Sequence, residues 1–202
     1  MFFYSQNTKK NCTFKTKDKI LESGLTLFSS QGYFNTSVQD IQKHSGVSIG
    51  SIYNYFEGKD KIAEELRIKI FEQMCDAFQD IVSQYDNFED KYLHIVKLMF
   101  EMTETESRTM NFIFHSKPSE YIDEIEYLYQ SNAFGVIFKQ IDASCSSDLI
   151  NSDKHSKEFI LASLFSLPIQ MIQLRLDGAI TTPLTQNIDT IFNTVWKGVC
   201  RK

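Results

Sequence analysis

The sequence predicts an all-α fold, because apolar residues recur every three or four positions and no convincing stretch alternates apolar and polar side chains. Only 3 prolines and 8 glycines interrupt the 202 residues, so long helices fit the chain more easily than many short strands. We expect about nine helices in total. The 17 phenylalanines and 9 tyrosines can fill a solid core or line a cavity within it, and both alternatives stay open.

The N-terminal third is expected to form three helices and the start of a fourth. The first covers residues 17–31, the second begins at Thr36 or Ser37, and the third begins at Ser48. The fourth starts at Asp60 and is long, because its apolar positions follow at four-residue spacing: Ile62, Leu66, Ile70, Met74 and Phe78.

Five further helices are expected, over residues 88–103, 109–115, 118–141, 155–177 and 186–200. The polar, serine-rich residues 142–153 are interpreted as a loop, and Pro168 should kink the helix in which it lies. The apolar stretch 159–174 contains serines and glutamines as well as this proline. It falls short of the roughly 20 clean apolar residues that a membrane span needs, so no membrane contact is expected.

Charge divides the chain into two expected domains, residues 1–62 and residues 63–202. The first contains 8 Lys/Arg and 5 Asp/Glu, a balance of +3, and the second contains the remaining 13 and 21, a balance of −8. A basic first domain on an acidic second one suits a nucleic-acid-binding part attached to a larger body.

The four cysteines and four histidines are scattered, with no two of them at the short spacing of metal ligands. We therefore expect no metal and no cofactor. The chain begins with Met1-Phe2-Phe3-Tyr4-Ser5-Gln6-Asn7, which is not the apolar core of a signal peptide. A soluble protein in the reducing cytoplasm is the resulting expectation.

The residues from Ile41 to Ile52 have the spacing of a helix-turn-helix motif. Ile41 supplies the apolar contact of the first helix, and Gly46 tolerates the positive φ of a tight turn. Val47 and Ile52 complete the apolar wedge. The second helix is short, and small or hydrogen-bonding residues on its outer side would let it enter a DNA major groove: Ile49, Gly50, Ser51, Asn54 and Tyr55.

Residues 17–66 resemble the TetR family of bacterial transcriptional repressors. The resemblance rests on the following strings: Leu27-Phe28, Gly32-Tyr33, Thr36-Ser37-Val38, Asp40-Ile41, Gly46-Val47-Ser48, Gly50, Tyr53, Phe56 and Lys59. It implies an N-terminal three-helix DNA-binding domain, followed by a larger helical domain that binds a ligand and forms a homodimer. Four residues depart from the family's usual alanines: Gln42, Ser45, Ser23 and Gly24.

The resemblance also implies the DNA contacts. Base edges would be contacted by Ile49, Gly50, Ser51 and Asn54, and phosphates of a double-stranded operator by Ser37, Ser48, Tyr53, Tyr55 and Lys59. For Tyr53 the alternative is a core aromatic with a solvated hydroxyl group. The basic cluster Lys9, Lys10, Lys15, Lys17 and Lys19 is either a DNA-binding arm or a solvated run.

The homodimer is expected to form through the last two long helices, because the stretch 159–174 is apolar on more than one face and needs two partners. Two subunits would also present two half-sites to DNA. The expected interface residues are Leu161, Leu164, Phe165, Ile169, Ile172, Trp196 and Val199.

A small apolar ligand is expected to bind the second domain and to lower DNA affinity. Candidate pocket residues are Met99, Phe100, Met102, Phe112, Tyr121, Tyr127, Phe134, Phe138, Phe165 and Met171, and each could instead be ordinary core. The alternative function is a DNA-binding adaptor that recruits a protein partner and has no pocket.

An enzyme is not expected. The run Gly46-Val47-Ser48-Ile49-Gly50 does match the G-x-S-x-G sequence of hydrolases. That motif needs a strand before the serine, and a helix is predicted there.

Overall fold

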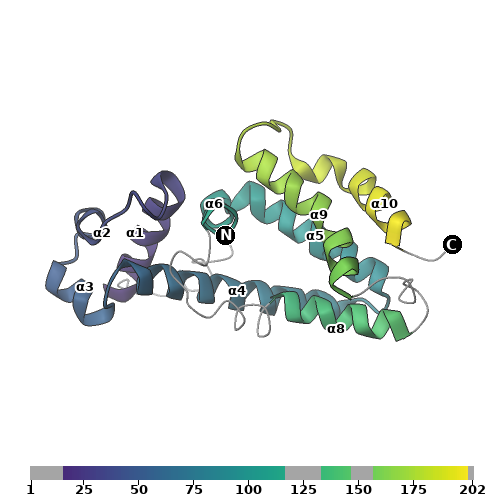
Figure 1. Ribbon diagram of the computed structural model, residues 1–202, viewed down its shortest axis with the longest axis horizontal. Coiled ribbons are helices and arrows are strands. Elements are labelled where there is room, and N and C mark those ends of the chain that lie inside the picture. Colours follow the sequence, from purple (N-terminus) through teal and green to yellow (C-terminus); the bar gives the residue numbers. More distant parts are fainter. Residues whose placement is uncertain (1–15, 117–132, 147–156, 200–202) are drawn as a thin grey trace. The chain divides into compact units, whose positions relative to one another are not determined.

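The computed structural model describes residues 16–116, 133–146 and 157–199 (Figure 1). Within these ranges the chain forms nine α-helices and one short 3₁₀ helix, and none of these residues is in a strand. The all-α prediction is confirmed. Most of the predicted helix over 118–141 lies outside the described ranges. Its last part is α8 (Ala133–Ser146), which continues into the predicted loop over 142–153, so that loop prediction was wrong at its start.

The chain divides into two compact units. The first unit comprises residues 1–73 and 106–128, and the second comprises residues 74–105 and 129–202. Helix α4 (Lys59–Gln84) begins in the first unit and ends in the second. The first break between the units falls after residue 73, later than the expected boundary between residues 62 and 63. The first unit also includes α6, from the middle of the sequence. The assignment of DNA binding to 1–62 stays a prediction.

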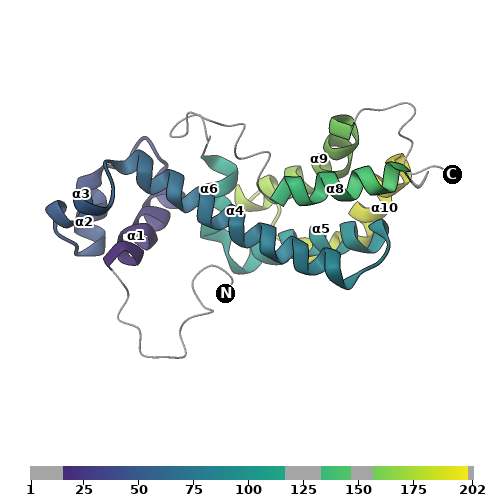
Figure 2. The ribbon, with the colours of Figure 1, turned by 90° about the horizontal axis from the view of Figure 1, so that it is seen from below.

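The first unit contains α1 (Thr16–Gln31), α2 (Val38–Ser45), α3 (Ile49–Tyr55), the start of α4 and α6 (Ser107–His115). Figures 1 and 2 show α2 and α3 at the N-terminal end of α4. Helix α1 packs against both α2 and α6. Its apolar face is completely buried, and with residues of the other helices it forms the core: Ile20, Leu21, Ile41, Ile52, Ile62 and Leu66.

Helix α6 is attached to the first unit by a buried cation. Arg67 on α4 is only 3% exposed, and its guanidinium donates to the carbonyl oxygens of Ile113 and Ser116 at 3.2 and 2.7 Å. These carbonyls lie at the C-terminal end of α6, where the helix dipole favours a positive charge. The ring of Phe112 stacks on Phe28 with centroids 5.9 Å apart. The segment after α5 therefore joins the N-terminal core, which local sequence patterns do not reveal.

The second unit contains the end of α4, α5 (Phe88–Thr105), α8, α9 (Lys157–Leu176), the 3₁₀ helix η2 (Leu184–Asn187) and α10 (Ile188–Val199). Helix α9 packs against α5, α8 and α10. Aromatic rings fill the core between α5, α9 and α10. Tyr92 lies at the centre of this cluster, within 6 Å of the ring centroids of Phe165, Phe192 and Trp196.

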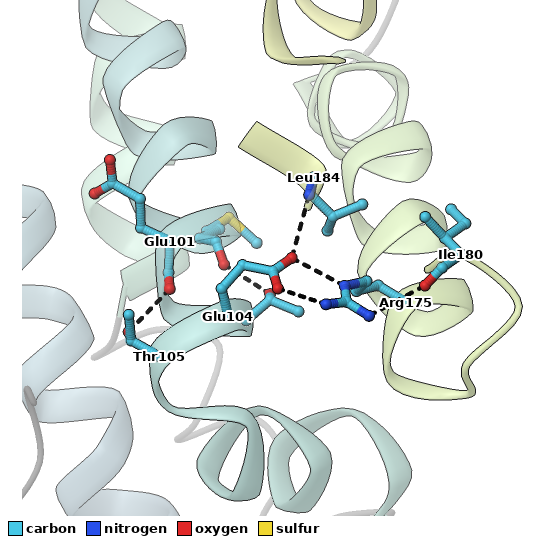
Figure 3. Close-up of polar contacts among 8 residues, drawn as sticks. Glu101, Glu104, Thr105, Arg175, Ile180 and Leu184 are labelled. Atoms are coloured by element: carbon cyan, nitrogen blue, oxygen red, sulfur yellow. Dashed lines mark hydrogen bonds and ion pairs between the residues drawn. The ribbon is translucent and has the colours of Figure 1, made fainter. Parts of the chain in front are cut away.

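Glu104 joins the end of α5 to the turn between α9 and α10 (Figure 3). Its two carboxylate oxygens accept from Nε and a terminal nitrogen of Arg175 at 3.0 and 2.7 Å. One of them also accepts from the backbone N–H of Leu184 at 3.2 Å. The bidentate bond from Arg175 is the largest cause that holds the pKa of Glu104 below its usual range. This pair fixes the geometry of the turn that leads into α10.

Helix α9 is the most uniformly apolar segment. Its residues Phe159–Leu176 are apolar and long enough to cross a membrane by composition, with a mean hydropathy of 1.5. The same helix packs against α5, α8, α10 and η2 and contains Pro168 and the paired Arg175. We interpret it as a packing helix. Only 28% of this stretch is buried inside the single chain, so much apolar surface is left for another partner.

Pro168 creates a local defect in α9 that a tyrosine repairs. A helical residue at this position would donate its N–H to the carbonyl of Leu164, and proline has no N–H. The hydroxyl group of Tyr92 donates to that carbonyl at 2.6 Å in the buried core. Burial raises the pKa of Tyr92, so the hydroxyl keeps the proton that it donates.

We expect Tyr92→Phe to lower the free energy of unfolding by about 1–3 kcal/mol, because the buried Leu164 carbonyl would lose its donor. In a Pro168→Ala background the new N–H of residue 168 can satisfy this carbonyl, so the same substitution should cost less than about 1 kcal/mol. Chemical denaturation of the four proteins of this double-mutant cycle measures the difference. An equal cost of Tyr92→Phe in both backgrounds would contradict the interpretation.

Candidate nucleic-acid interface

The start of α2 is fixed by a reciprocal capping box. Ser37 is the N-cap, and its Oγ accepts the backbone N–H of Asp40 at 3.2 Å. The Asp40 carboxylate in turn accepts the backbone N–H of Ser37 at 2.9 Å and its hydroxyl at 2.6 Å. The hydrogen bond from the Ser37 side chain is the main cause that lowers the pKa of Asp40. Ser37 thus positions α2, and its hydroxyl proton already has an acceptor.

The turn between α2 and α3 depends on Gly46 and Ser45. Gly46 has a φ of +67°, which is the left-handed conformation predicted for it, and its N–H bonds to the Gln42 carbonyl at 3.1 Å. The hydroxyl of Ser45 accepts the N–H of Val47 at 3.2 Å. An alanine at position 45 could not make this bond. The departure from the family pattern at Ser45 therefore adds a hydrogen bond to the turn.

Helix α3 is held by its cap and by one apolar residue. Ser48 is the N-cap and accepts the N–H of Ser51 at 3.2 Å, and their hydroxyl oxygens are 2.8 Å apart. Ile52 is completely buried, and Phe56 ends the helix with 4% exposure. The helix that precedes Ser48 shows that the G-x-S-x-G match lies in a helix-turn-helix. Its serine serves as a helix cap here.

The outer face of α3 is exposed as the sequence predicted. Tyr53 is 53% exposed, Tyr55 50% and Ile49 40%. Gly50 and Asn54 are also exposed, and a methyl group built on Gly50 would meet no atom within 4 Å. Tyr53 is therefore not the core aromatic of the alternative reading. A seven-residue helix with two exposed tyrosines and one exposed isoleucine presents a surface suited to binding.

Lys59 has a bracing role that the sequence did not indicate. Its ammonium group donates to the backbone carbonyls of Tyr33 and Thr36 at 2.9 and 3.0 Å and lies 4.3 Å from the centre of the Tyr33 ring. The Tyr33 hydroxyl donates to the carboxylate of Asp60. These contacts tie the α1–α2 turn to the start of α4. Lysine has three donors, so contact with phosphate stays a prediction for this residue.

Two further departures from the family pattern are explained by the contacts of α1. The Oγ of Ser23 lies 3.0 Å from Nδ1 of His44, which links α1 to the end of α2. Gly24 lies against α4, because a Cβ added there would be only 2.8 Å from Cγ2 of the buried Ile62. An alanine at position 24 would force the Ile62 side chain to shift, so glycine lets the two helices approach closely here.

The basic cluster is described only in part. Lys9, Lys10 and Lys15 lie outside the described residues. Lys17 pairs with Glu65 at 2.7 Å and covers the ring of Phe56 at 5.5 Å, which favours a structural role for it. Lys19 is exposed on α1.

The predicted pocket residues separate into three groups. Met99, Phe100, Met102 and Phe165 are buried in the second unit, and Met171 is half-buried there. Phe112 is corrected: it packs against Phe28 in the first unit and is not part of the body's core. Tyr121 and Tyr127 lie outside the described residues, as do the side chains of Phe134 and Phe138 in α8.

The residues predicted to form the dimer interface differ in how far they are buried within the single chain. Leu164, Phe165 and Ile172 are at most 3% exposed within the single chain, so they belong to its own core and are removed from the interface list. Leu161, Ile169 and Trp196 are half-buried and keep surface for a partner. The side chain of Val199 is not among those described. On α9 the most exposed apolar residue is Phe159, at 55%, which the prediction did not include.

Residues 20–66 match the model of a protein family that is described as "Bacterial regulatory proteins, tetR family". The "Probable HTH-type transcriptional regulator YttP" of Bacillus subtilis is 31% identical over 87 residues, 43% of this chain and 42% of that protein. The icaADBC operon's negative transcriptional regulator IcaR of Staphylococcus epidermidis is 32% identical over 92 residues, 44% of this chain and 48% of the relative. The chain spans about half the length of the curated relatives that it matches.

Solved structures share the fold over nearly the whole chain. A TetR family transcription regulator from Marinobacter aquaeolei superposes with a TM-score of 0.78 at 20% identity and covers 93% of this chain and 96% of that one. The regulator FadR from Bacillus subtilis, solved in complex with stearoyl-CoA, gives 0.77 at 15% identity and covers 89% and 97%. Fold and motif together define a helix-turn-helix regulatory protein. Residues 20–66 match the tetR family of bacterial regulatory proteins, and the chain shares the fold of TetR family regulators.

Proposed function

We propose that this protein is a sequence-specific, DNA-binding transcriptional regulator, and that it acts as a repressor in the cytoplasm. The single observation that carries the proposal is the exposed outer face of α3, held rigidly between the Ser48 cap and the buried Ile52. A short helix presented in this way fits the major groove. IcaR, which matches the N-terminal part of the chain, is a negative regulator, and this supports repression.

We propose that the protein forms a homodimer. A single α3 reads only a few base pairs, so useful specificity needs two half-sites. The apolar surface that α9 leaves uncovered supports α9 as the main interface helix. The outer side of α10 is polar, with Asp189, Thr190, Asn193 and Thr194 exposed, so its contribution is expected to be smaller than that of α9.

We also propose that a small apolar ligand binds the second unit and releases the protein from DNA. Met99, Met102 and Phe165 lie on α5 and α9, which pack together in the second unit, and these side chains are the proposed walls of the site. Helix α4 continues from this unit into the first, where its Arg67 holds α6. A change in the second unit can therefore reach the DNA-binding helices through α4.

We expect the full-length protein to enrich a defined duplex from a random DNA pool. Asn54→Ala should change the preferred base at one position of each half-site, with a loss of about 1–3 kcal/mol on the selected duplex. Tyr53→Phe should weaken binding to all sequences by a similar factor, because it removes one hydroxyl donor to phosphate. Gel-shift titration of selected and scrambled duplexes measures both effects.

The matched control is Asn193→Ala, which removes an equally exposed asparagine from α10. It should leave DNA affinity unchanged. Failure of the wild-type protein to enrich any sequence above random DNA would sink the proposal of a specific regulator.

For the dimer, we expect sedimentation equilibrium at micromolar concentration to give twice the mass of the 23.5 kDa chain. Ile169→Lys should shift the protein toward monomer, because it places a charge on the half-buried apolar surface of α9. Gln73→Lys adds the same charge at an exposed position of α4 and should remain dimeric. A monomeric wild type, or equal association of both variants, argues against α9 as the interface.

For the ligand, stearoyl-CoA and free fatty acids are suitable first probes, because a protein of this fold was solved with stearoyl-CoA. Trp196 is the single tryptophan and stacks on Tyr92 and Phe192, so its fluorescence reports on the second unit. A compound that changes this fluorescence should also lower DNA affinity about 5–150-fold. A compound that binds without changing DNA affinity would contradict ligand release. DNA binding that no compound of a broad metabolite screen alters would favour the partner-recruiting adaptor.

A further inference from the structure

Phe34 is an exposed aromatic side chain beside the candidate DNA interface. It lies in the turn between α1 and α2, and at 74% it is the most exposed large apolar side chain of the described residues. None of the predicted DNA contacts includes it. A phenylalanine that is 74% exposed adds little to the core, so another physical reason for its position is needed.

The turn that carries Phe34 is rigid. The side-chain amide of Gln31 donates to the Asn35 carbonyl at 3.1 Å, and the side-chain amide of Asn35 donates to the Gln31 carbonyl at 2.9 Å. The hydroxyl of Thr36 bonds to the Gly32 carbonyl at 2.8 Å. The ammonium of Lys59 holds the carbonyls on both sides of Phe34. Together these hydrogen bonds hold the backbone on both sides of Phe34.

Phe34 cannot fold back into the core, because its neighbour occupies that place. Tyr33 is only 6% exposed, and its ring packs against Phe28 with centroids 5.7 Å apart. The ring of Phe34 stands edge-on to Tyr33 at 5.5 Å. Lys59 packs on the same Tyr33 ring at 4.3 Å. The Phe34 ring thus lies against Tyr33, whose ring Lys59 also contacts, and Phe34 stands three residues before the Ser37 cap of α2. Lys59 and Ser37 both belong to the candidate interface.

We propose that Phe34 is a DNA contact that packs its ring against the deoxyribose of the strand bordering the major groove. This inference rests on the proposed DNA-binding function. In a helix-turn-helix the first helix crosses the sugar-phosphate backbone, and Phe34 lies in the turn that leads into that helix, α2. The ring has no hydrogen-bonding group for a phosphate. The apolar surface that the backbone offers is the sugar itself, and covering it gives binding energy without a charge.

The absence of charge makes the contact distinguishable from a phosphate contact. A lysine that contacts a phosphate contributes to the slope of log affinity against log salt concentration, because it releases a counterion. Phe34 releases none. Its loss should therefore lower affinity by the same factor at every salt concentration.

The test compares wild type with Phe34→Ala and Phe34→Leu, using the duplex enriched by the wild-type protein. We expect Phe34→Ala to weaken binding by about 10-fold or more, with an unchanged salt slope, and Phe34→Leu to restore most of the affinity. Hydroxyl-radical footprinting should show that Phe34→Ala loses protection of deoxyribose at one position flanking each half-site. Thermal unfolding should show that both variants are folded, since the side chain is exposed.

The outcomes separate this inference from the proposed function. If the wild type enriches a duplex and Phe34→Ala binds it equally well, the inference is overturned while the proposed regulator stands. A reduced salt slope for Phe34→Ala also overturns it, because the loss would be electrostatic. If the wild type enriches no duplex, the proposed function fails and this inference with it.

Discussion

The hydrogen bonds from Lys59 to the α1–α2 turn are the constraint on which the N-terminal unit depends. The carbonyl of Tyr33 also accepts the backbone N–H of Thr36 at 3.2 Å, and the Lys59 ammonium is a second donor to it. By donating to the carbonyls of both Tyr33 and Thr36, Lys59 fixes the start of α4 against the α1–α2 turn. The Tyr33 hydroxyl bond to Asp60 doubles the attachment. The capping box of α2 begins one residue after Thr36, so the direction of α2, and through Gly46 that of α3, is set from this point.

The same unit is closed from its other side by a second cation. Arg67 is buried and is held by carbonyls at the end of α6 and by the faces of Phe71 and Phe112. Removing such a partner would leave a buried charge or buried carbonyls unsatisfied, which is costly in a low-dielectric interior. Helix α4 thus carries two cations that are eight residues apart. Lys59 binds the α1–α2 turn, and Arg67 binds the C-terminal end of α6. Within the first unit, a tilt of α4 would therefore move the α1–α2 turn and α6 together.

The sequence predicted the parts of the fold that depend on neighbours in the chain. A cap at Thr36 or Ser37, the cap Ser48, the left-handed Gly46 and the apolar Ile52 were predicted from local spacing. The structure shows Ser37 and Ser48 as the caps, Gly46 with a positive φ and Ile52 buried. Local sequence patterns do not predict which distant residues contact one another. Arg67 meets carbonyls 46 and 49 residues away, and Glu104 meets Arg175 71 residues away. Phe112 was misplaced for this reason, since its periodicity shows that it is buried but not in which unit.

Helix α9 shows a different limit of sequence reasoning. Because it is apolar on more than one face, periodicity does not tell which apolar residues face the chain's own core, and Leu164, Phe165 and Ile172 were assigned to an interface although they are buried. The polar residues of α9 follow at helical spacing on one side, and specific polar contacts add to the orientation that this side gives: Ser163, Ser166, Gln170 and Gln173. Two such contacts hold α9 in place. Tyr92 bonds the carbonyl that Pro168 leaves open in the middle of the helix, and Glu104 binds Arg175 near its end. These two contacts limit the rotation of α9 about its axis. They thereby determine which of its apolar residues face the core of the chain and which stay exposed.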